Sequence, residues 1–164
     1  MSFKIEENGQ FRGTVIFSGA ELNDGAIDDK HVSAAADIAA SKLEHQHRAV
    51  YSQESDTTAA AEDHVIHIVV GAAGTLKKFS AGVVVACIGD ATVTVDLHKG
   101  GASILTAAIA IDSGDAAYAV VDATIDTAAV VVDDVLEVVV TVAAGTGTLG
   151  KGVFAALDLW EDVD

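Results

Sequence analysis

Proline is absent from the 164 residues, and cysteine occurs only once. No disulfide can therefore form within the chain, and the apolar stretch around Cys87, VVVACIG, predicts a buried and unreactive thiol. Aromatic residues make up only 5% of the sequence, although 51% of it is hydrophobic. The core must therefore consist mainly of valine, alanine, isoleucine and leucine, and β-branched valine favours β-sheet.

Basic residues are also scarce, with 9 lysines and arginines against 25 acidic residues and a net charge of −16. Such a surface repels nucleic-acid phosphates and anionic lipids, so we expect neither nucleic acid nor membrane as a partner. The longest apolar runs, such as residues 82–88, are far shorter than a membrane-spanning helix. The opening residues, MSFKIEENGQ, contain no apolar signal region, so export is not indicated.

The composition changes along the chain at about residue 64. The first 63 residues contain one possible short strand at 11–17 (FRGTVIF), a predicted helix at 31–43 and the polar stretch SQESDTTAAAED, which is typical of a linker or surface loop. From His64 onward, short apolar segments alternate with glycine and aspartate turns. The sequence thus predicts an N-terminal arm, 1–63, and a β-domain, 64–164.

The β-domain is predicted from alternating apolar and polar residues. The segment from Thr92 to His98 is the cleanest, because Val93, Val95 and Leu97 share one side. Other strands are predicted at residues 65–70, 79–88, 117–125, 130–132 and 136–142, whereas 102–111 fits a strand or a short helix and 153–160 fits a strand or a terminal helix. Seven or eight short strands in about a hundred residues indicate an all-β fold, an antiparallel β-sandwich.

The predicted helix carries one apolar stripe, made of Val32, Ala35, Ala36, Ala39 and Leu43. An isolated helix of this length is marginal in water, so it must dock on something. These five residues are therefore the predicted contacts with the β-domain, a neighbouring subunit or a capsid.

Two segments resemble bacteriophage proteins. Residues 27–43, IDDKHVSAAADIAASKL, resemble a segment recurrent in phage fibres and head-decoration proteins, where it joins an attachment arm to a β-domain. Residues 92–105, TVTVDLHKGGASIL, are similar to strand-and-turn segments in jelly-roll modules of phage virion proteins. The resemblance favours a jelly roll over an immunoglobulin-like sandwich, which the strand pattern alone does not separate.

The resemblance implies a non-enzymatic virion structural protein of a tailed bacteriophage, either a capsid decoration (cement) protein or a head-fibre subunit. Such a protein is assembled in the host cytoplasm and binds copies of itself, most simply as a homotrimer, together with the major capsid protein or other virion proteins. One alternative is a tail-fibre module that recognises host glycans through exposed aromatic rings, for which the candidates are Tyr51, Tyr118, Phe154 and Trp160. Another is a β-sandwich from a halophilic microbe, whose acidity reflects its solvent.

Two histidines, His45 and His47, are the only metal-ligand candidates that the sequence suggests. An extended strand would place both rings on one side, with His64 and His67 further along the chain. If the resemblance to phage fibres holds, such pairs from three chains could meet on a threefold axis and bind a metal. Because one chain's pair supplies only two ligands, the favoured interpretation is polar residues that lead out of the helix and can stack at a subunit contact, and no cofactor is predicted.

No catalytic residues are predicted. The run GTGTLGKG, residues 145–152, imitates a phosphate-binding loop, but Gly152 replaces the hydroxyl residue that would hold magnesium, and too few residues follow for the helix that such a loop requires. A flexible hairpin loop is the favoured interpretation. The carboxylates of Asp112, Asp115 and Asp122 are scattered, and the chain has neither an EF-hand calcium loop nor a nucleophile elbow.

Overall fold

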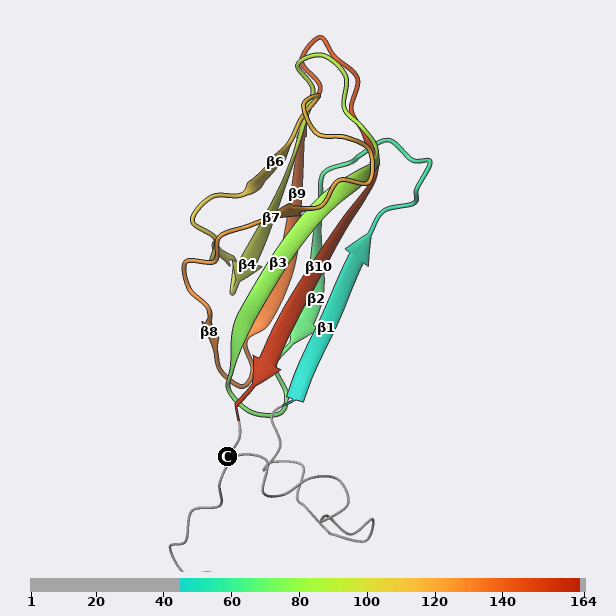
Figure 1. Ribbon diagram of the computed structural model, residues 1–164. Coiled ribbons are helices and arrows are strands. Elements are labelled where there is room, and N and C mark those ends of the chain that lie inside the picture. The colour runs from blue at the N-terminus through green and yellow to red at the C-terminus, as the bar shows by residue number, and fades with distance from the viewer. Residues whose placement is uncertain (1–44, 163–164) are drawn as a thin grey trace, which may run out of the picture. The chain divides into compact units, whose positions relative to one another are not determined.

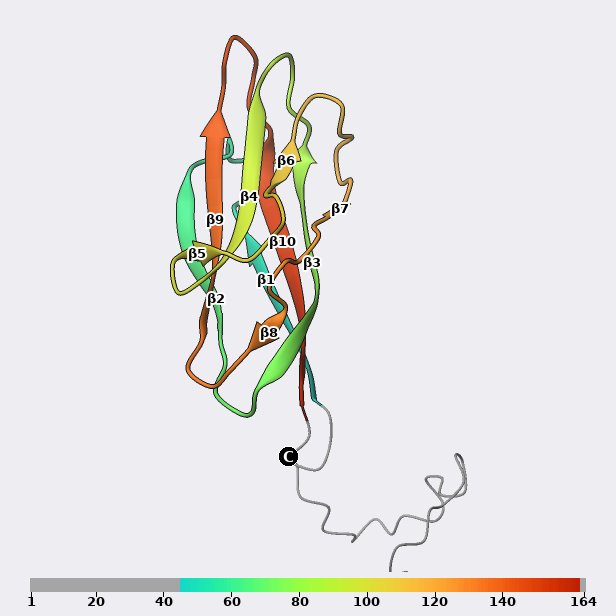
Figure 2. The ribbon, with the colours of Figure 1, turned by 90° about the vertical axis from the view of Figure 1, so that its left-hand side faces the viewer.

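The computed structural model describes residues 45–162 as two antiparallel β-sheets packed face to face (Figure 1, Figure 2). The predicted all-β antiparallel sandwich is confirmed. Within this part of the chain no helix is long and apolar enough to cross a membrane. Two predicted elements lie outside the described residues, namely the strand at 11–17 and the helix at 31–43. The predicted contact residues of that helix lie outside them as well: Val32, Ala35, Ala36, Ala39 and Leu43.

The ten strands divide equally between the two sheets. In chain order they are β1 His45–Ser52, β2 Glu62–Ile68, β3 Gly74–Val85, β4 Thr92–Lys99, β5 Ala102–Ser103, β6 Ile109–Ile111, β7 Val121–Asp122, β8 Ala129–Val130, β9 Val135–Ala143 and β10 Lys151–Glu161. Sheet A has the order β1-β10-β3, with β7 and β8 both beside β3. Sheet B has the order β2-β9-β4, with β5 and β6 both beside β4.

The strands pair from the two ends of this range inward. β1 pairs with β10, β2 with β9, β3 with β7 and β8, and β4 with β5 and β6, always antiparallel. The first four strands alternate between the sheets, so that their connections cross from one layer to the other at the ends of the sandwich (Figure 2).

The sandwich begins earlier than the sequence predicted. β1 pairs with β10 along its whole length, from His45 opposite Glu161 to Ser52 opposite Phe154, so the predicted domain boundary between residues 63 and 64 is wrong. The polar stretch at 52–63 is the loop from β1 to β2, with Ser52 and Glu62 already in the strands. The alternation in HQHRAVYS went unrecognised because histidines occupy two of its inward positions, where aliphatic residues are usual.

Aliphatic side chains fill the space between the sheets, as the composition requires. Val93, Val95 and Leu97 of β4 are fully buried and face the core together, as their alternation predicts. Residues 153–160 form part of the strand β10, and 102–111 contains the short strands β5 and β6, which resolves both ambiguities in favour of strand. Cys87 is buried as expected, and its sulfur accepts a hydrogen bond from the Gly150 amide.

Candidate functional site

Two edge strands meet along one side of the sandwich. β1 is the edge of sheet A and β2 is the edge of sheet B, and the two are in contact. Four histidines lie on this seam, which we call the histidine seam: His45 and His47 on β1, and His64 and His67 on β2. These four imidazole rings are the side chains from which a candidate site on this seam can be built.

The carboxylate of Glu161, the last residue of β10, meets the two histidines of β1. Its Oε2 atom lies 3.5 Å from Nδ1 of His45 and 3.1 Å from Nε2 of His47. One ligand atom from each of the three side chains lies within 4.8 Å of the other two. The register explains the convergence, because His45 is the direct partner of Glu161 and all three side chains project from the inner face of sheet A.

The β2–β3 loop holds the Glu161 side chain in place. A Cβ atom on Gly71 would lie 2.5 Å from Oε1 of Glu161, so only glycine leaves room for the carboxylate here. The Asp162 amide donates a hydrogen bond to the Ala73 carbonyl oxygen at 2.8 Å, which fixes the end of β10 against the same loop. Burial raises the pKa of Glu161, but His47, the Ala72 amide and His45 together lower it by more than burial raises it. The pKa of Glu161 therefore lies below its usual range.

The contact between His47 and Glu161 is close but poorly aligned for a hydrogen bond. Nε2 of His47 is buried and has no hydrogen-bond partner, although it lies 3.1 Å from the Glu161 oxygen, so the two atoms are close without being aligned. The ring of His67 packs against that of His47 with a centroid distance of 5.7 Å. Burial, followed by the neighbouring His47, lowers the pKa of His67, and Glu161 opposes this shift.

The other end of the histidine seam is closed by a tyrosine. The Tyr51 hydroxyl donates a hydrogen bond of 2.8 Å to Oε2 of Glu62, and the His64 ring lies 5.3 Å from the Tyr51 ring, measured between centroids. Burial and then the bond to Glu62 raise the pKa of Tyr51 to about 12. At this end of the seam, a neutral phenol therefore donates a hydrogen bond to a carboxylate, whereas at the other end two imidazoles meet the Glu161 carboxylate.

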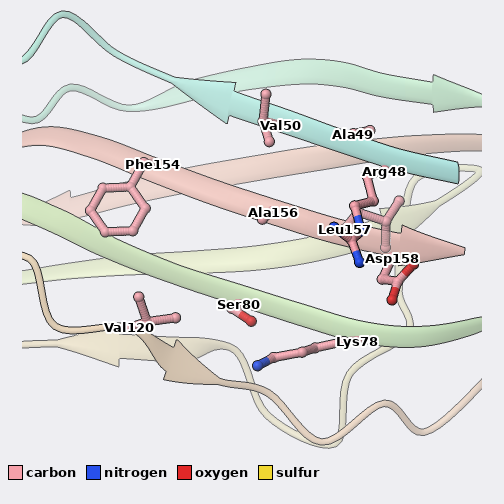
Figure 3. A pocket seen from close by; sticks show the side chains of 10 residues that line it. All are labelled: Arg48, Ala49, Val50, Lys78, Ser80, Val120, Phe154, Ala156, Leu157 and Asp158. Carbon is pink, nitrogen blue, oxygen red and sulfur yellow. The ribbon is translucent and has the colours of Figure 1, made fainter.

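The outer face of sheet A carries an open hollow of about 360 Å³ (Figure 3). Small residues of the two central strands, Ser80 and Ala156, form part of its lining, together with the larger Val50, Val120 and Phe154. Val50 is 78% exposed and Val120 is 60% exposed. Such a set of exposed apolar side chains on one sheet face is typical of a contact surface.

Charged groups of both signs lie around this hollow. Arg48, Lys78 and Asp158 line it, and Lys78 forms an ion pair of 3.0 Å with Asp122. Gln46, and not Arg48, donates hydrogen bonds to both oxygens of the Asp158 carboxylate. The hollow therefore offers basic groups in a protein whose surface is otherwise strongly acidic.

The aromatic residues do not form one platform. Tyr51 is buried and bonded to Glu62, and Trp160 is covered by Lys77, whose Nζ lies 5.1 Å from the ring centroid. Phe154 lies in the hollow and packs over Gly82, where a Cβ atom would lie 2.5 Å from its ring. Tyr118, at 70% exposed, is the most accessible of the four.

The run GTGTLGKG forms a loop, but it is not a hairpin. It joins β9 of sheet B to β10 of sheet A, and a strand follows it where a phosphate-binding loop requires a helix. A Cβ atom on Gly147 would lie 2.1 Å from the Ile88 carbonyl oxygen, so this glycine serves the close approach of two loops. Of the carboxylates in residues 45–162, Glu161 alone belongs to a three-residue cluster with metal-ligand spacing.

His45 and His47, which the sequence suggested, thus meet a residue that the sequence analysis missed, Glu161. The position of Glu161 opposite His45 depends on the pairing of β1 with β10, which no local sequence pattern predicts. Comparison of the chain with protein-family models, with curated proteins and with solved structures found no match.

Proposed function

We propose that this chain is a non-enzymatic virion structural protein of a tailed bacteriophage, a capsid decoration or head-fibre subunit, that works by binding copies of itself and other virion proteins. The hollow on the outer face of sheet A is the observation that carries the proposal. Val50, on the edge strand β1, exposes 78% of its surface there. An exposed apolar surface of this kind is stabilised when a partner covers it.

A second copy of the chain is the partner that fits this hollow. With a net charge of −16, copies repel one another unless the contact supplies local attraction. Arg48 and Lys78 supply basic groups at the hollow, and Asp158 supplies an acidic group beside them. Each copy thus offers both partners of an ion pair, which a contact between identical subunits requires.

A jelly roll is the specific sandwich that we propose. In this fold of two sheets, the first strand pairs with the last, the second strand pairs with the last but one, and the inner strands pair with one another. The pairing of β1 with β10, of β2 with β9 and of the inner strands with one another follows this scheme. It supports the similarity of residues 92–105 to jelly-roll modules of phage virion proteins.

The arm supplies the second half of the proposal. Val32, Ala35, Ala36, Ala39 and Leu43 are the residues through which we propose that residues 1–44 contact neighbouring subunits or the capsid. A separate contact on a tether raises overall affinity without enlarging the sandwich, because the second binding event becomes intramolecular.

Two valines with equal exposure provide the test. Val50 lies in the hollow, whereas Val70, which is 77% exposed, follows β2 and lies outside it. We expect light scattering to give the mass of a trimer of 16.7 kDa subunits for the unaltered protein and for Val70→Asp, and a smaller mass for Val50→Asp. A monomer for the unaltered protein at micromolar concentration, or equal effects of the two substitutions, would contradict the proposal.

Glycan recognition is the second candidate, and the exposure of Tyr118 is what favours it. An aromatic ring that is open to solvent can stack on a sugar. Binding on a glycan array that is lost in Tyr118→Ala, from a protein that is monomeric in solution, would support this function over the first.

A further inference from the structure

We infer that His45, His47 and Glu161 form a binding site for one divalent transition-metal ion per chain, with zinc the ion that the donor set fits best. This inference goes beyond the proposed function, because the site lies on the histidine seam and not in the outer hollow of sheet A. The three ligands come from the first and the last described strands, so a bound ion would join β1 to β10 by coordination as well as by hydrogen bonds.

The distances from the two histidines to Glu161 suit a tetrahedral ion. Zinc binds imidazole nitrogen and carboxylate oxygen at about 2.0–2.2 Å, which places two ligand atoms of a tetrahedron about 3.3–3.6 Å apart. The two histidine-to-Glu161 separations, 3.5 Å and 3.1 Å, lie close to this value. The ring centroids of His45 and His47 are 6.4 Å apart and nearly perpendicular, which leaves space between the rings.

The hydrogen bonding of His47 is a second observation. Its Nε2 atom is buried without a hydrogen-bond partner, although a carboxylate oxygen lies 3.1 Å away. A buried polar atom without a partner is unfavourable, and native structures rarely contain one. A cation held between the nitrogen and the oxygen would satisfy both atoms at once.

The surroundings of Glu161 prepare it to act as a ligand. Gly71 leaves room for the carboxylate, whose Oε2 atom lies 3.5 Å from His45 and 3.1 Å from His47. A ligand that is held by its neighbours before the ion arrives loses less entropy on binding.

The donor set also determines which ion is expected. Two imidazole nitrogens exclude calcium and magnesium as preferred occupants, because those ions select oxygen ligands. Two histidines and one glutamate are a known zinc set that leaves a fourth coordination position for water or another group. The His67 ring, which packs against His47, adjoins this arrangement on the side of sheet B.

The full-length protein, stripped of metal with a chelator, provides the test. We expect zinc to bind in isothermal titration calorimetry with one ion per chain, and cobalt(II) to give the visible absorption of a tetrahedral nitrogen–oxygen site. His47→Ala and the isosteric Glu161→Gln should each weaken zinc binding by at least about 100-fold, the upper range for loss of even an outer-shell partner. Zinc should raise the melting temperature of the unaltered protein and not that of the two variants.

A matched control is available on sheet B. His98 also lies 3.1 Å from a carboxylate, that of Asp96, but this pair belongs to no three-residue cluster within the described range. His98→Ala should therefore bind zinc like the unaltered protein. Circular dichroism without metal would verify that the variants fold. If His47→Ala does not fold, Glu161→Gln alone provides the test.

Three results would overturn the inference: no saturable zinc binding below millimolar concentration, unaltered affinity in a folded Glu161→Gln variant, or one ion per three chains. The last would place the ion on a threefold axis between copies. The mass of the assembly measured for Val50→Asp does not depend on these results. A negative result for zinc binding would therefore leave the proposed self-association untouched.

Discussion

The hydroxyl of Tyr51 joins the two sheets through a hydrogen bond of 2.8 Å to the Glu62 carboxylate. Tyr51 belongs to β1 of sheet A and Glu62 begins β2 of sheet B. Gln53 donates a hydrogen bond of 2.9 Å to the same hydroxyl oxygen, so the group acts as donor and acceptor together. Only the neutral phenol can donate the proton that this arrangement requires.

Tyr51 therefore makes the fold sensitive to alkali. Its folded-state pKa, raised to about 12, exceeds the unfolded value of 10.0, chiefly because burial disfavours the charged phenolate. A raised pKa gives stability that is complete below about pH 10 and is lost as the pH rises toward 12. We expect the melting temperature to fall across this window, and to fall less steeply in Tyr51→Phe, which cannot ionise.

Tyr118 provides the control for that measurement, because it is 70% exposed and its phenol is not buried. Tyr118→Phe should retain the slope of the unaltered protein in the same pH range. Parallel curves for the unaltered protein and Tyr51→Phe would show that the hydroxyl does not couple ionisation to folding.

Asp90 makes the stability of the fold sensitive to acid. Its Oδ1 atom accepts hydrogen bonds from the Thr146 amide at 2.8 Å and the Thr146 hydroxyl at 3.1 Å, which tie the β3–β4 turn to the β9–β10 loop. The Thr146 amide is the largest cause that lowers the pKa of Asp90 below 3.8. A lowered pKa gives stability that is present above the unfolded value and is lost as the pH falls through the folded one.

We therefore expect Asp90→Ala to melt at a lower temperature than the unaltered protein at neutral pH, with a difference that shrinks as the pH falls below about 4. Asp90→Asn is the matched variant, because one amide oxygen can accept both bonds without titrating. Its melting temperature should depend less on pH than that of the unaltered protein. A difference for Asp90→Ala that stays constant down to pH 2 would exclude the ionised carboxylate as the cause.

The sequence predicted the strands in which apolar and polar residues alternate along the chain. β4 was found because the segment from Thr92 to His98 alternates without interruption between half-exposed and buried positions, and this pattern is independent of what lies opposite. β1 has the same alternation, but His45 and His47 occupy inward positions, so its apolar face is recognisable only from Ala49 and Tyr51. The missed strand and the missed domain boundary are therefore the same error.

The candidate site could be predicted only in part for a related reason. His45 and His47 are neighbours in the sequence, and the spacing of two residues on a strand was enough to place them together. Glu161 joins them through a pairing between β1 and β10, and contacts over such distances are set by the folding of the whole chain. The rejection of a phosphate-binding loop at 145–152 needed only local sequence, but the predicted hairpin is wrong because β9 and β10 belong to different sheets.

The inward face of β4 gives a prediction about the core. Leu97 is fully buried, and Leu97→Ala should lower the free energy of unfolding by about 2–5 kcal/mol, because it removes buried methyl groups and leaves a cavity. Thr94→Ala on the half-exposed face of the same strand should lower it by less than about 1 kcal/mol. Urea unfolding followed by circular dichroism measures both, and equal losses would contradict the assignment of the two faces.

Gly71 connects the loop geometry to the inferred metal site. A methyl group on this residue would lie 2.5 Å from Oε1 of Glu161, and the carboxylate at the end of a flexible side chain is the group that moves. Gly71→Ala should therefore displace Glu161 from His47 without unfolding the sandwich. We expect zinc affinity to fall by about 10–100-fold, the range found when a group that orients a ligand is altered.

Gly114→Ala is the appropriate comparison for this substitution. Gly114 lies in the loop between β6 and β7, and the nearest atom to its added methyl group would be Oδ1 of Asp112, at 3.1 Å. This variant should bind zinc like the unaltered protein, so that any loss in Gly71→Ala reflects the position of the methyl group and not the change in residue type. If Gly71→Ala keeps full zinc affinity while Glu161→Gln loses it, the carboxylate reaches the ion without support from the β2–β3 loop. The ligand assignment would then hold, and the role given to Gly71 would be wrong.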